Sequence, residues 1–278
     1  MNYTQTAIFS DLDGTLFDSH GLVSEKNLAA ILDYTAQGGL FAIATGRSYL
    51  NAKKYLPGVQ INAPCIVFNG AGVYDPKLQN YPYAVHADHE AVEKVLFWCR
   101  EHLPMIDTQV YGEQMTYYVT PKETATKELV RQLLPNEFTT IEEILPFPWF
   151  KTLHYGQPEE MRTLEQFLKE SGVDRRVAIV RAITEIPPYH EHIELLPKNL
   201  NKGSALHFCR TLPIYAGRLM IGIGDYKNDI ELLEAADIAC CPENACDEIK
   251  NLSSHVLPSN NDNAIASLIY DCIPSISI

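Results

Sequence analysis

Four short clusters of polar residues, each directly after an apolar run, carry side chains that could do chemistry. These clusters are Asp11-Leu12-Asp13-Gly14-Thr15, Thr45-Gly46-Arg47, Asn69-Gly70-Ala71 and Gly224-Asp225. The apolar runs before them are typical of short buried strands and cover Thr6–Ser10, Leu40–Ala44, Cys65–Phe68 and Leu219–Ile223. Ligands bind just beyond the carboxyl ends of the strands in an open parallel sheet. We therefore expect the four clusters to meet along one edge.

Asp11 and Asp13 are spaced so that both carboxylates point to the same side of a strand end. Two carboxylates placed in this way repel each other, and both stay ionised only beside a cation. A third carboxylate from Asp225 would complete a site of hard oxygen ligands. Because such a site has few carboxylates and room for water, it suits Mg²⁺ better than Ca²⁺. The competing interpretation is a solvated acidic turn, since Asp and Gly are common in loops.

Lys202 supplies a positive charge in an informative place. Asn201 is a suitable N-cap, which puts Lys202 in the first turn of a helix over Lys202–Cys209. A lysine there opposes the helix dipole at a cost of about 0.3–1 kcal/mol. The placement makes sense if the ammonium and the helix end share an anion such as phosphate. An exposed lysine without a role is the alternative. The Thr45-Gly46-Arg47 cluster adds a hydroxyl, a backbone N–H and a guanidinium, all donors suited to phosphate oxygens.

The elements that must position these residues alternate between strand and helix at both ends of the chain. After the first strand, Ser24 can cap a helix that ends at Gly38-Gly39. The pattern returns late, as a strand, a helix and two short strands at Leu219–Ile223, Asn228–Ala235, Ile238 and Val256. The order predicts an α/β fold whose core is a doubly wound, Rossmann-like parallel sheet.

The middle of the chain has a different pattern of predicted elements, in which helices are grouped around paired strands. We expect helices at Ala87–His102, Lys122–Leu134 and Pro158–Ser171. The expected strands are Ile106–Val110, Met115–Thr120, Phe150–His154, Val177–Ile183 and His192–Leu196. These elements indicate an α+β module over residues 84–196, inserted into an α/β domain of residues 1–83 and 197–278.

Composition and charge exclude several classes of protein. The chain has 278 residues, 46% of them apolar, and a formal net charge of −13, which argues against a nucleic-acid surface. No apolar run is long enough to span a bilayer, and the start carries no basic signal region, so we expect a cytoplasmic protein. The seven cysteines form no C-x-x-C pair, which favours reduced, mostly buried thiols over a zinc site. Neither a dinucleotide fingerprint nor a P-loop is present.

The clusters, taken in order, resemble the four motifs of the haloacid dehalogenase superfamily. The matching segments are Asp11-Leu12-Asp13-Gly14-Thr15-Leu16, Thr45-Gly46-Arg47, Asn201-Lys202-Gly203 and Gly224-Asp225-Tyr226-Lys227-Asn228-Asp229. The large insertion between the second and third motifs, together with the Asn69-Gly70-Ala71 turn, resembles the Cof-type phosphatases. This resemblance implies that residues 84–196 are a cap domain and that residues 1–83 and 197–278 are the catalytic core. The chain departs from this pattern outside the motifs. Glu243 stands where the family often has a Gly before Asn244-Ala245, and Asn263 replaces a frequent Gly.

The resemblance implies a role for each motif residue. Asp11 would attack phosphorus and form an aspartyl-phosphate, and Asp13 would serve as general acid and then general base. Mg²⁺ would be held by the carboxylates of Asp11 and Asp225 and by the backbone carbonyl of Asp13. The phosphoryl oxygens would be held by Thr45, Lys202, Asn228 and the backbone around Leu12, Gly14 and Gly46. Asp229 would orient Lys202 or a metal-bound water. Arg47 and Asn69 would either reach toward substrate or cap, or make structural hydrogen bonds.

The implied function is a Mg²⁺-dependent phosphatase for small phosphorylated metabolites such as sugar phosphates, with no nucleic-acid or membrane partner. The cap should close over the core, exclude bulky substrates and set specificity. Two alternatives stay open. A phosphosugar mutase or other phosphotransferase would share the first half-reaction, and a non-catalytic protein could bind a phosphorylated ligand. The oligomeric state and the physiological substrate do not follow from the sequence.

Overall fold

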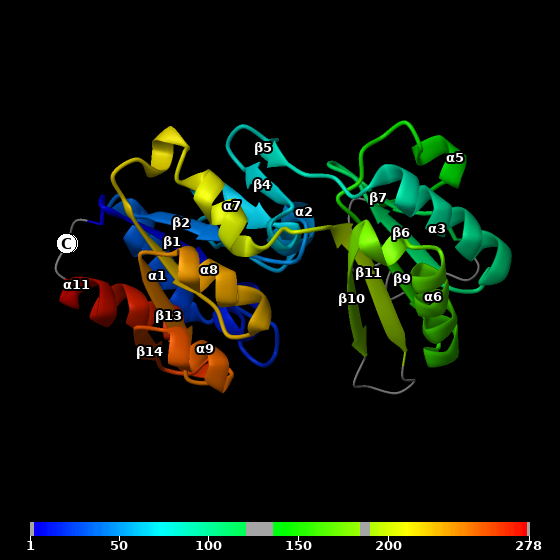
Figure 1. The fold of residues 1–278 in the computed structure, drawn as a ribbon. Coiled ribbons are helices and arrows are strands. Elements are labelled where there is room, and N and C mark those ends of the chain that lie inside the picture. The colour runs from blue at the N-terminus through cyan, green and yellow to red at the C-terminus, as the bar shows by residue number, and fades with distance from the viewer. Residues whose placement is uncertain (1–2, 121–135, 184–189, 277–278) are drawn as a thin grey trace. The chain divides into compact units, whose positions relative to one another are not determined.

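The computed structural model describes residues 3–120, 136–183 and 190–276, which divide into two compact units (Figure 1). The first unit combines Met1–Tyr83 with Leu200–Ile278, and the second is the continuous segment Ala84–Asn199. The chain thus leaves the first unit after Tyr83 and returns to it at Leu200.

A five-stranded parallel sheet forms the centre of the first unit, in the order β14-β13-β12-β1-β2. Its strands are β1 (Thr6–Ser10), β2 (Leu40–Ile43), β12 (Leu219–Ile223), β13 (Ile238–Pro242) and β14 (His255–Leu257). Strand β1, which lies between β12 and β2, is buried along its whole length, as expected where both faces of a sheet are covered by helices. The prediction of an α/β fold with a parallel sheet is confirmed.

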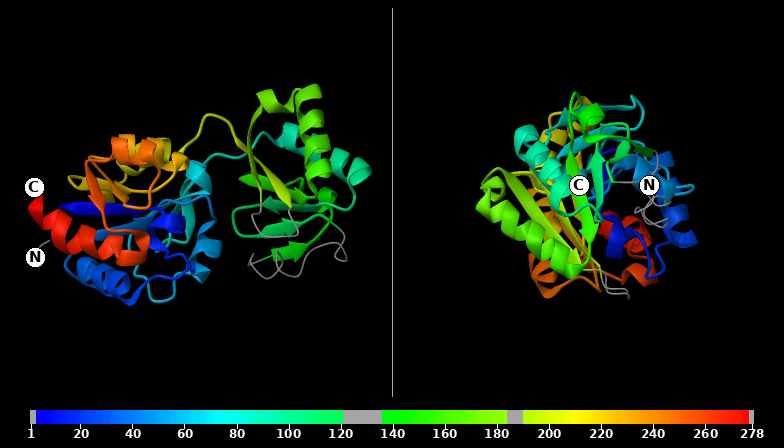
Figure 2. Two further views of the ribbon diagram at one scale, coloured as in Figure 1. Left: turned by 90° about the horizontal axis from the view of Figure 1, so that it is seen from below. Right: turned by 90° about the vertical axis from the view of Figure 1, so that its right-hand side faces the viewer.

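Helices cover both faces of this sheet (Figure 2). The described helices of the first unit are α1 (Glu25–Ala36), α2 (Tyr49–Lys54), α7 (Lys202–Cys209), α8 (Ile230–Ala235), α9 (Asp247–Leu252), α10 (Ala264–Ser267) and α11 (Ile273–Ser275). Ser24 caps α1 by accepting the N–H of Asn27 at 3.2 Å, and Asn201 caps α7 by accepting the N–H of Ser204 at 2.8 Å. Both predicted N-caps are therefore confirmed.

A small sheet continues the first unit beyond β2, because Ala44 forms a parallel bridge to Ile66. This sheet contains β3 (Cys65–Val67), β4 (Gly72–Asp75) and β5 (Asn80–Ala84). The turn between β3 and β4 contains Phe68 and Asn69, both with positive φ. The sequence pattern predicted β3 and this turn, but not β4 and β5.

The second unit contains a six-stranded, mostly antiparallel sheet in the order β10-β11-β9-β6-β7-β8. Its strands are β6 (Asp107–Tyr111), β7 (Thr116–Tyr118), β8 (Asn136–Phe138), β9 (Lys151–Gly156), β10 (Val177–Ile183) and β11 (Glu191–Pro197). Its helices are α3 (His89–His102), α5 (Ile141–Ile144) and α6 (Pro158–Glu170). Apolar side chains from α3, α6 and the sheet pack into a separate core around Trp149. The helix expected over Lys122–Leu134 lies outside the described residues.

All seven cysteines are free thiols, and six of them are buried. Each helix in the described part of the chain falls short of the length and apolar character that a bilayer span requires.

Candidate active site

The parallel register of the core sheet brings the ends of three strands to one edge. Ser10, the last residue of β1, lies opposite Ile223 of β12 and Ile43 of β2. The next residues continue the ladder, since the N–H of Asp11 donates to the carbonyl of Ile223 at 2.9 Å. The polar clusters that follow these strands therefore lie side by side, as the sequence pattern predicted.

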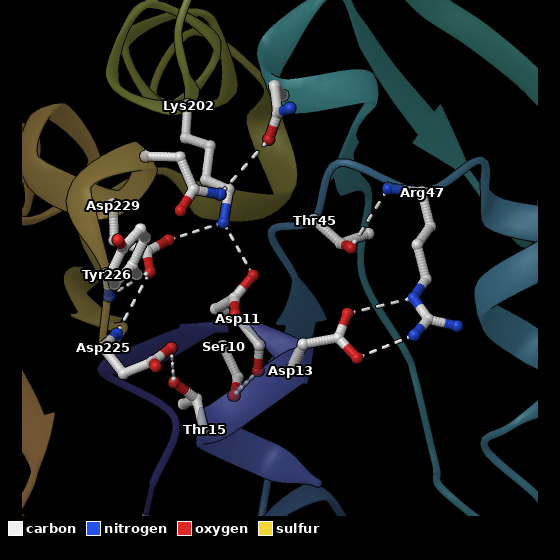
Figure 3. A network of polar contacts seen from close by, with 12 residues as sticks. Ser10, Asp11, Asp13, Thr15, Thr45, Arg47, Lys202, Asp225, Tyr226 and Asp229 are labelled. Atoms are coloured by element: carbon white, nitrogen blue, oxygen red, sulfur yellow. Dashed lines mark hydrogen bonds and ion pairs between the residues drawn. The ribbon is translucent and has the colours of Figure 1, made fainter. Parts of the chain in front are cut away.

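Lys202 lies at the centre of this edge, between Asp11 and Asp229 (Figure 3). Its Nζ donates to Oδ1 of Asp11 at 2.6 Å and to Oδ1 of Asp229 at 2.5 Å. The lysine and Asp229 have no exposed surface, and Asp11 is 7% exposed. A buried ammonium is tolerated only when it is paired. Lys202 is therefore not the exposed surface lysine of the alternative interpretation.

Asp225 and Asp229 complete an acidic group at the carboxyl end of β12. Among the described residues, Asp11, Asp225 and Asp229 each offer an oxygen atom, and these atoms lie within 4.8 Å of one another. Oδ2 of Asp229 is already used, because it accepts the backbone N–H groups of Asp225 at 3.1 Å and Tyr226 at 3.3 Å. Asp11 and Asp225 are therefore better suited than Asp229 to bind a cation directly.

Crowding and burial shift the protonation of these groups. Burial raises the pKa of Asp11 to about 7 although Lys202 opposes the shift, and Asp229 adds to it. Burial and then Asp229 raise the pKa of Asp225 to about 6. Burial alone would lower the pKa of Lys202, but Asp11 and Asp229 outweigh it and raise that pKa above its usual value. Three carboxylates share one ammonium, so the group has an excess of negative charge that a bound cation would offset.

Asp13 turns away from this group, and Figure 3 shows its carboxylate pointing toward Arg47. Nε of Arg47 donates to Oδ2 of Asp13 at 3.0 Å, and Nη2 donates to Oδ1 at 2.7 Å. The carboxylates of Asp11 and Asp13 thus have different partners, although the residues are two positions apart. In this structure the Arg47 guanidinium is bound to a carboxylate.

Thr45, Gly46, Asn69 and Asn228 form a second group beside the first. The N–H of Asn69 donates to the carbonyl of Thr45 at 3.0 Å, and the side chain of Asn228 donates to Oδ1 of Asn69 at 3.4 Å. A Cβ atom at Gly46 would lie 2.9 Å from the Asn69 amide. The hydroxyl of Thr45 accepts the N–H of Arg47 at 3.2 Å.

The loop after Asp11 is fixed by two residues to which the sequence interpretation gave no role. Thr15 donates its hydroxyl to Oδ1 of Asp225 at 3.1 Å, and Asn244 donates its amide to the carbonyl of Gly14 at 2.8 Å. Gly14 has a φ of +77°, and a Cβ atom there would lie 2.3 Å from Oδ2 of Asp225. Leu12 buries its side chain completely. Thr15 belongs to the first motif, Asp11 to Leu16, so its position in that motif could have indicated a role in the site.

A family profile described as haloacid dehalogenase-like hydrolase matches residues 8–269. The chain belongs to the haloacid dehalogenase-like hydrolases. The resemblance predicted from the four motifs is confirmed, and with it the expectation of a hydrolase.

Two curated relatives are similar to this chain along most of their length. The protein named 5-amino-6-(5-phospho-D-ribitylamino)uracil phosphatase YwtE, from Bacillus subtilis, is 27% identical over 292 residues, which cover 93% of this chain and 95% of the relative. The HMP-PP phosphatase of Serratia proteamaculans is 26% identical over 247 residues, covering 87% and 85%.

A solved structure supports the fold. The crystal structure of a haloacid dehalogenase-like hydrolase from Bacteroides thetaiotaomicron has a TM-score of 0.77 and 19% identity, and the match covers 95% of this chain and 98% of that one. At this identity the likeness concerns the fold alone.

One departure from the family pattern has a simple structural explanation. Asn263, one of the two departures named in the sequence analysis, has a left-handed backbone with a φ of +68° and a ψ of +49°. Asn is among the few residues with a side chain that adopt this conformation readily. Its Oδ1 accepts the hydroxyl of Ser24 at 2.7 Å, so the substitution also adds a contact to the start of α1.

Proposed function

We propose that this protein is a Mg²⁺-dependent phosphatase that hydrolyses small phosphorylated metabolites through an aspartyl-phosphate on Asp11. The observation that carries the proposal is the buried Asp11 carboxylate, held by Lys202 at 2.6 Å beside Asp225. A carboxylate that is fixed in this way by a cation is oriented to act as a nucleophile.

In the first step an oxygen of Asp11 bonds to phosphorus while the bond from phosphorus to the leaving oxygen breaks. Asp13 gives its proton to that leaving oxygen, so the alcohol departs neutral. Lys202, Thr45, Asn228 and the backbone around Gly46 donate hydrogen bonds to the phosphoryl oxygens as charge develops there.

In the second step water attacks phosphorus and Asp13 takes the proton from that water. The bond between phosphorus and the Asp11 oxygen then breaks, which releases phosphate and restores both side chains to their starting states. Asp229 keeps Lys202 in place throughout, because it holds the ammonium at 2.5 Å.

The residues present fit a magnesium ion. The carboxylate oxygens of Asp11 and Asp225 are hard ligands. The pKa values of both groups are raised, and a nearby cation would lower them again. Together with the backbone carbonyl of Asp13 they would hold the ion. A bound Mg²⁺ would supply positive charge between the attacking carboxylate and the anionic phosphate.

We further propose that residues 84–196 form the cap that sets the choice of substrate, because the proposed core residues act on the phosphoryl group. The relatives described above are named as phosphatases of 5-amino-6-(5-phospho-D-ribitylamino)uracil and of HMP-PP, and the first of these names supports sugar phosphates or similar monoesters as the substrate class. The free thiols are typical of the cytoplasm, where we expect the enzyme to act.

Phosphate release from a panel of phosphorylated metabolites tests the proposal directly. With Mg²⁺ we expect turnover of at least one small monoester, and its loss when the metal is chelated. Asp11→Asn should abolish turnover while circular dichroism shows an intact fold. Full activity in that variant, or in the chelated protein, would contradict the proposal.

A further inference from the structure

The Asp13–Arg47 pair is unusual among the contacts of the site because it involves an exposed carboxylate. The Asp13 side chain is 63% exposed and the Arg47 side chain is 30% exposed, yet both carboxylate oxygens have a partner. An unpaired aspartate with this exposure would sample several rotamers. A two-bond contact with a planar guanidinium selects one orientation of the carboxylate.

Arg47 is also held in place by contacts other than its pair with Asp13. Its Cζ lies 5.0 Å from the centre of the Tyr55 ring and 5.7 Å from that of Phe17, a buried side chain. Its carbonyl accepts the N–H of Phe68 at 3.1 Å. The rings and the backbone contacts fix the position of the guanidinium, which therefore acts as a rigid support.

We propose that Arg47 is a positioning residue that orients Asp13 for proton transfer and does not serve as a ligand of the phosphoryl group. The inference rests on the proposed function, in which Asp13 is the general acid and base. A carboxylate offers about four lone-pair sites. Two N–H bonds therefore leave sites on Asp13 for the proton that passes to the leaving oxygen and later returns from water.

The dependence of the rate on the leaving group separates positioning from phosphate binding. Phenyl phosphate and p-nitrophenyl phosphate are similar in shape and carry the same phosphoryl group, but phenolate is the poorer leaving group and needs its proton more. The value of kcat/KM covers the steps up to departure of the leaving group and so reports the acid step. A phosphate ligand would serve both esters equally.

For Arg47→Met we expect kcat/KM to fall about 10- to 100-fold with phenyl phosphate, the cost of a misplaced catalytic group. With p-nitrophenyl phosphate we expect a fall of less than about threefold, because this ester gains little from acid assistance. Arg47→Lys keeps the positive charge but loses the planar guanidinium that makes two hydrogen bonds. As in Arg47→Met, kcat/KM should therefore fall more with phenyl phosphate than with p-nitrophenyl phosphate. In the double variant, Arg47→Met should lower kcat/KM little beyond the effect of Asp13→Asn, since both substitutions impair the same proton transfer.

Arg210 offers a matched control in the same unit. It also forms a two-bond pair, with both carboxylate oxygens of Asp237 at 3.0 Å, and its side chain is 33% exposed. Arg210→Met removes such a pair without touching Asp13. It should leave the ratio of kcat/KM for the two esters unchanged.

The outcomes distinguish this inference from the proposed function. If the wild-type protein releases phosphate but Arg47→Met lowers kcat/KM equally for both esters, the positioning role is wrong. The same holds if Arg47→Lys restores the wild-type ratio, because charge alone would then suffice. If the wild-type protein hydrolyses neither these esters nor any metabolite, the proposed function itself fails.

Discussion

Lys202 holds its charge at a position with no exposed surface, and two carboxylates make this possible. Each contact is charge-assisted and short, and in a buried site both are far stronger than on the surface. The same arrangement places Asp11 next to a fixed positive charge. The lysine therefore connects the stability of the core to the orientation of the proposed nucleophile.

Removing this ammonium should cost both stability and activity. Lys202→Met leaves Asp11 and Asp229 buried without their partner, and we expect a loss of about 3–5 kcal/mol in the free energy of unfolding. Urea unfolding followed by circular dichroism measures it. Lys151→Met shows what the loss of a buried ion pair costs outside the site, because Lys151 forms such a pair with Glu194 at 2.6 Å in the other unit. An unchanged urea midpoint for Lys202→Met would contradict the account.

Gly14 tests the packing against Asp225. Gly14→Ala places a Cβ 2.3 Å from Oδ2 of Asp225, in addition to the strain of its positive φ. Gly21 has a similar φ of +74° with nothing within 4 Å of the added atom, so Gly21→Ala measures the backbone cost alone. We expect Gly21→Ala to cost about 1–2 kcal/mol and to leave Mg²⁺ affinity unchanged. Gly14→Ala should weaken that affinity about 10-fold or more, measured by calorimetry. Equal affinities for the two variants would count against Asp225 as a ligand.

At the scale of the elements, the sequence predicted the structure best where its signals were local. The strand Val177–Ile183 and the helix Lys202–Cys209 have the predicted bounds, because β-branched runs and N-caps act over a few residues. The hairpin of β4 and β5 was missed, since β5 is partly exposed and contains Pro82.

The site was predictable only in part. Convergence of the four clusters was predictable, because parallel strands end at one edge. The pairing of Asp13 with Arg47 was not predictable, since it depends on a rotamer choice and on the rings of Phe17 and Tyr55. Asn244 was equally hidden, because its contact with Gly14 joins residues far apart in the sequence.

His154 on β9 makes the second unit sensitive to acid. The ring is fully buried between the hydroxyls of Thr108 at 3.2 Å and Thr152 at 3.1 Å, and burial lowers its pKa from 6.5 to about 3. Between these two values the unfolded chain binds a proton that the folded chain does not. Stability should therefore fall as the pH drops through this window, by up to about 1.4 kcal/mol per pH unit.

Both tryptophans, Trp98 and Trp149, lie in the second unit, so their fluorescence follows its unfolding. Urea midpoints measured at several pH values should show the slope in the wild-type protein and a smaller slope in His154→Gln. Identical slopes in the two proteins would show that His154 does not bear this cost.

At the scale of the whole molecule, the chain consists of two units with separate interiors. The second unit is one continuous segment and has its own apolar core around Trp149. A domain with its own core is able in principle to fold alone. The sequence suggested this division through a change in the pattern of predicted elements, from alternating strand and helix to helices grouped around paired strands.

We therefore expect a fragment of residues 84–199 to fold without the rest of the chain. Its thermal unfolding, followed by tryptophan fluorescence, should be a single cooperative transition. A fragment that lacks a transition, or that exposes its tryptophans at low temperature, would show that its core depends on the other unit.

The central claim is that Asp11 becomes phosphorylated during turnover, and mass spectrometry of an acid-quenched reaction tests it most directly. Asp13→Asn is the suitable protein and p-nitrophenyl phosphate the suitable substrate, because the good leaving group departs without an acid while hydrolysis lacks its base. With Mg²⁺ present, the account predicts one phosphoryl group on the peptide that contains Asp11, and none on that peptide in Asp11→Asn. Release of nitrophenol with no phosphoryl group on Asp11 at any time would contradict it.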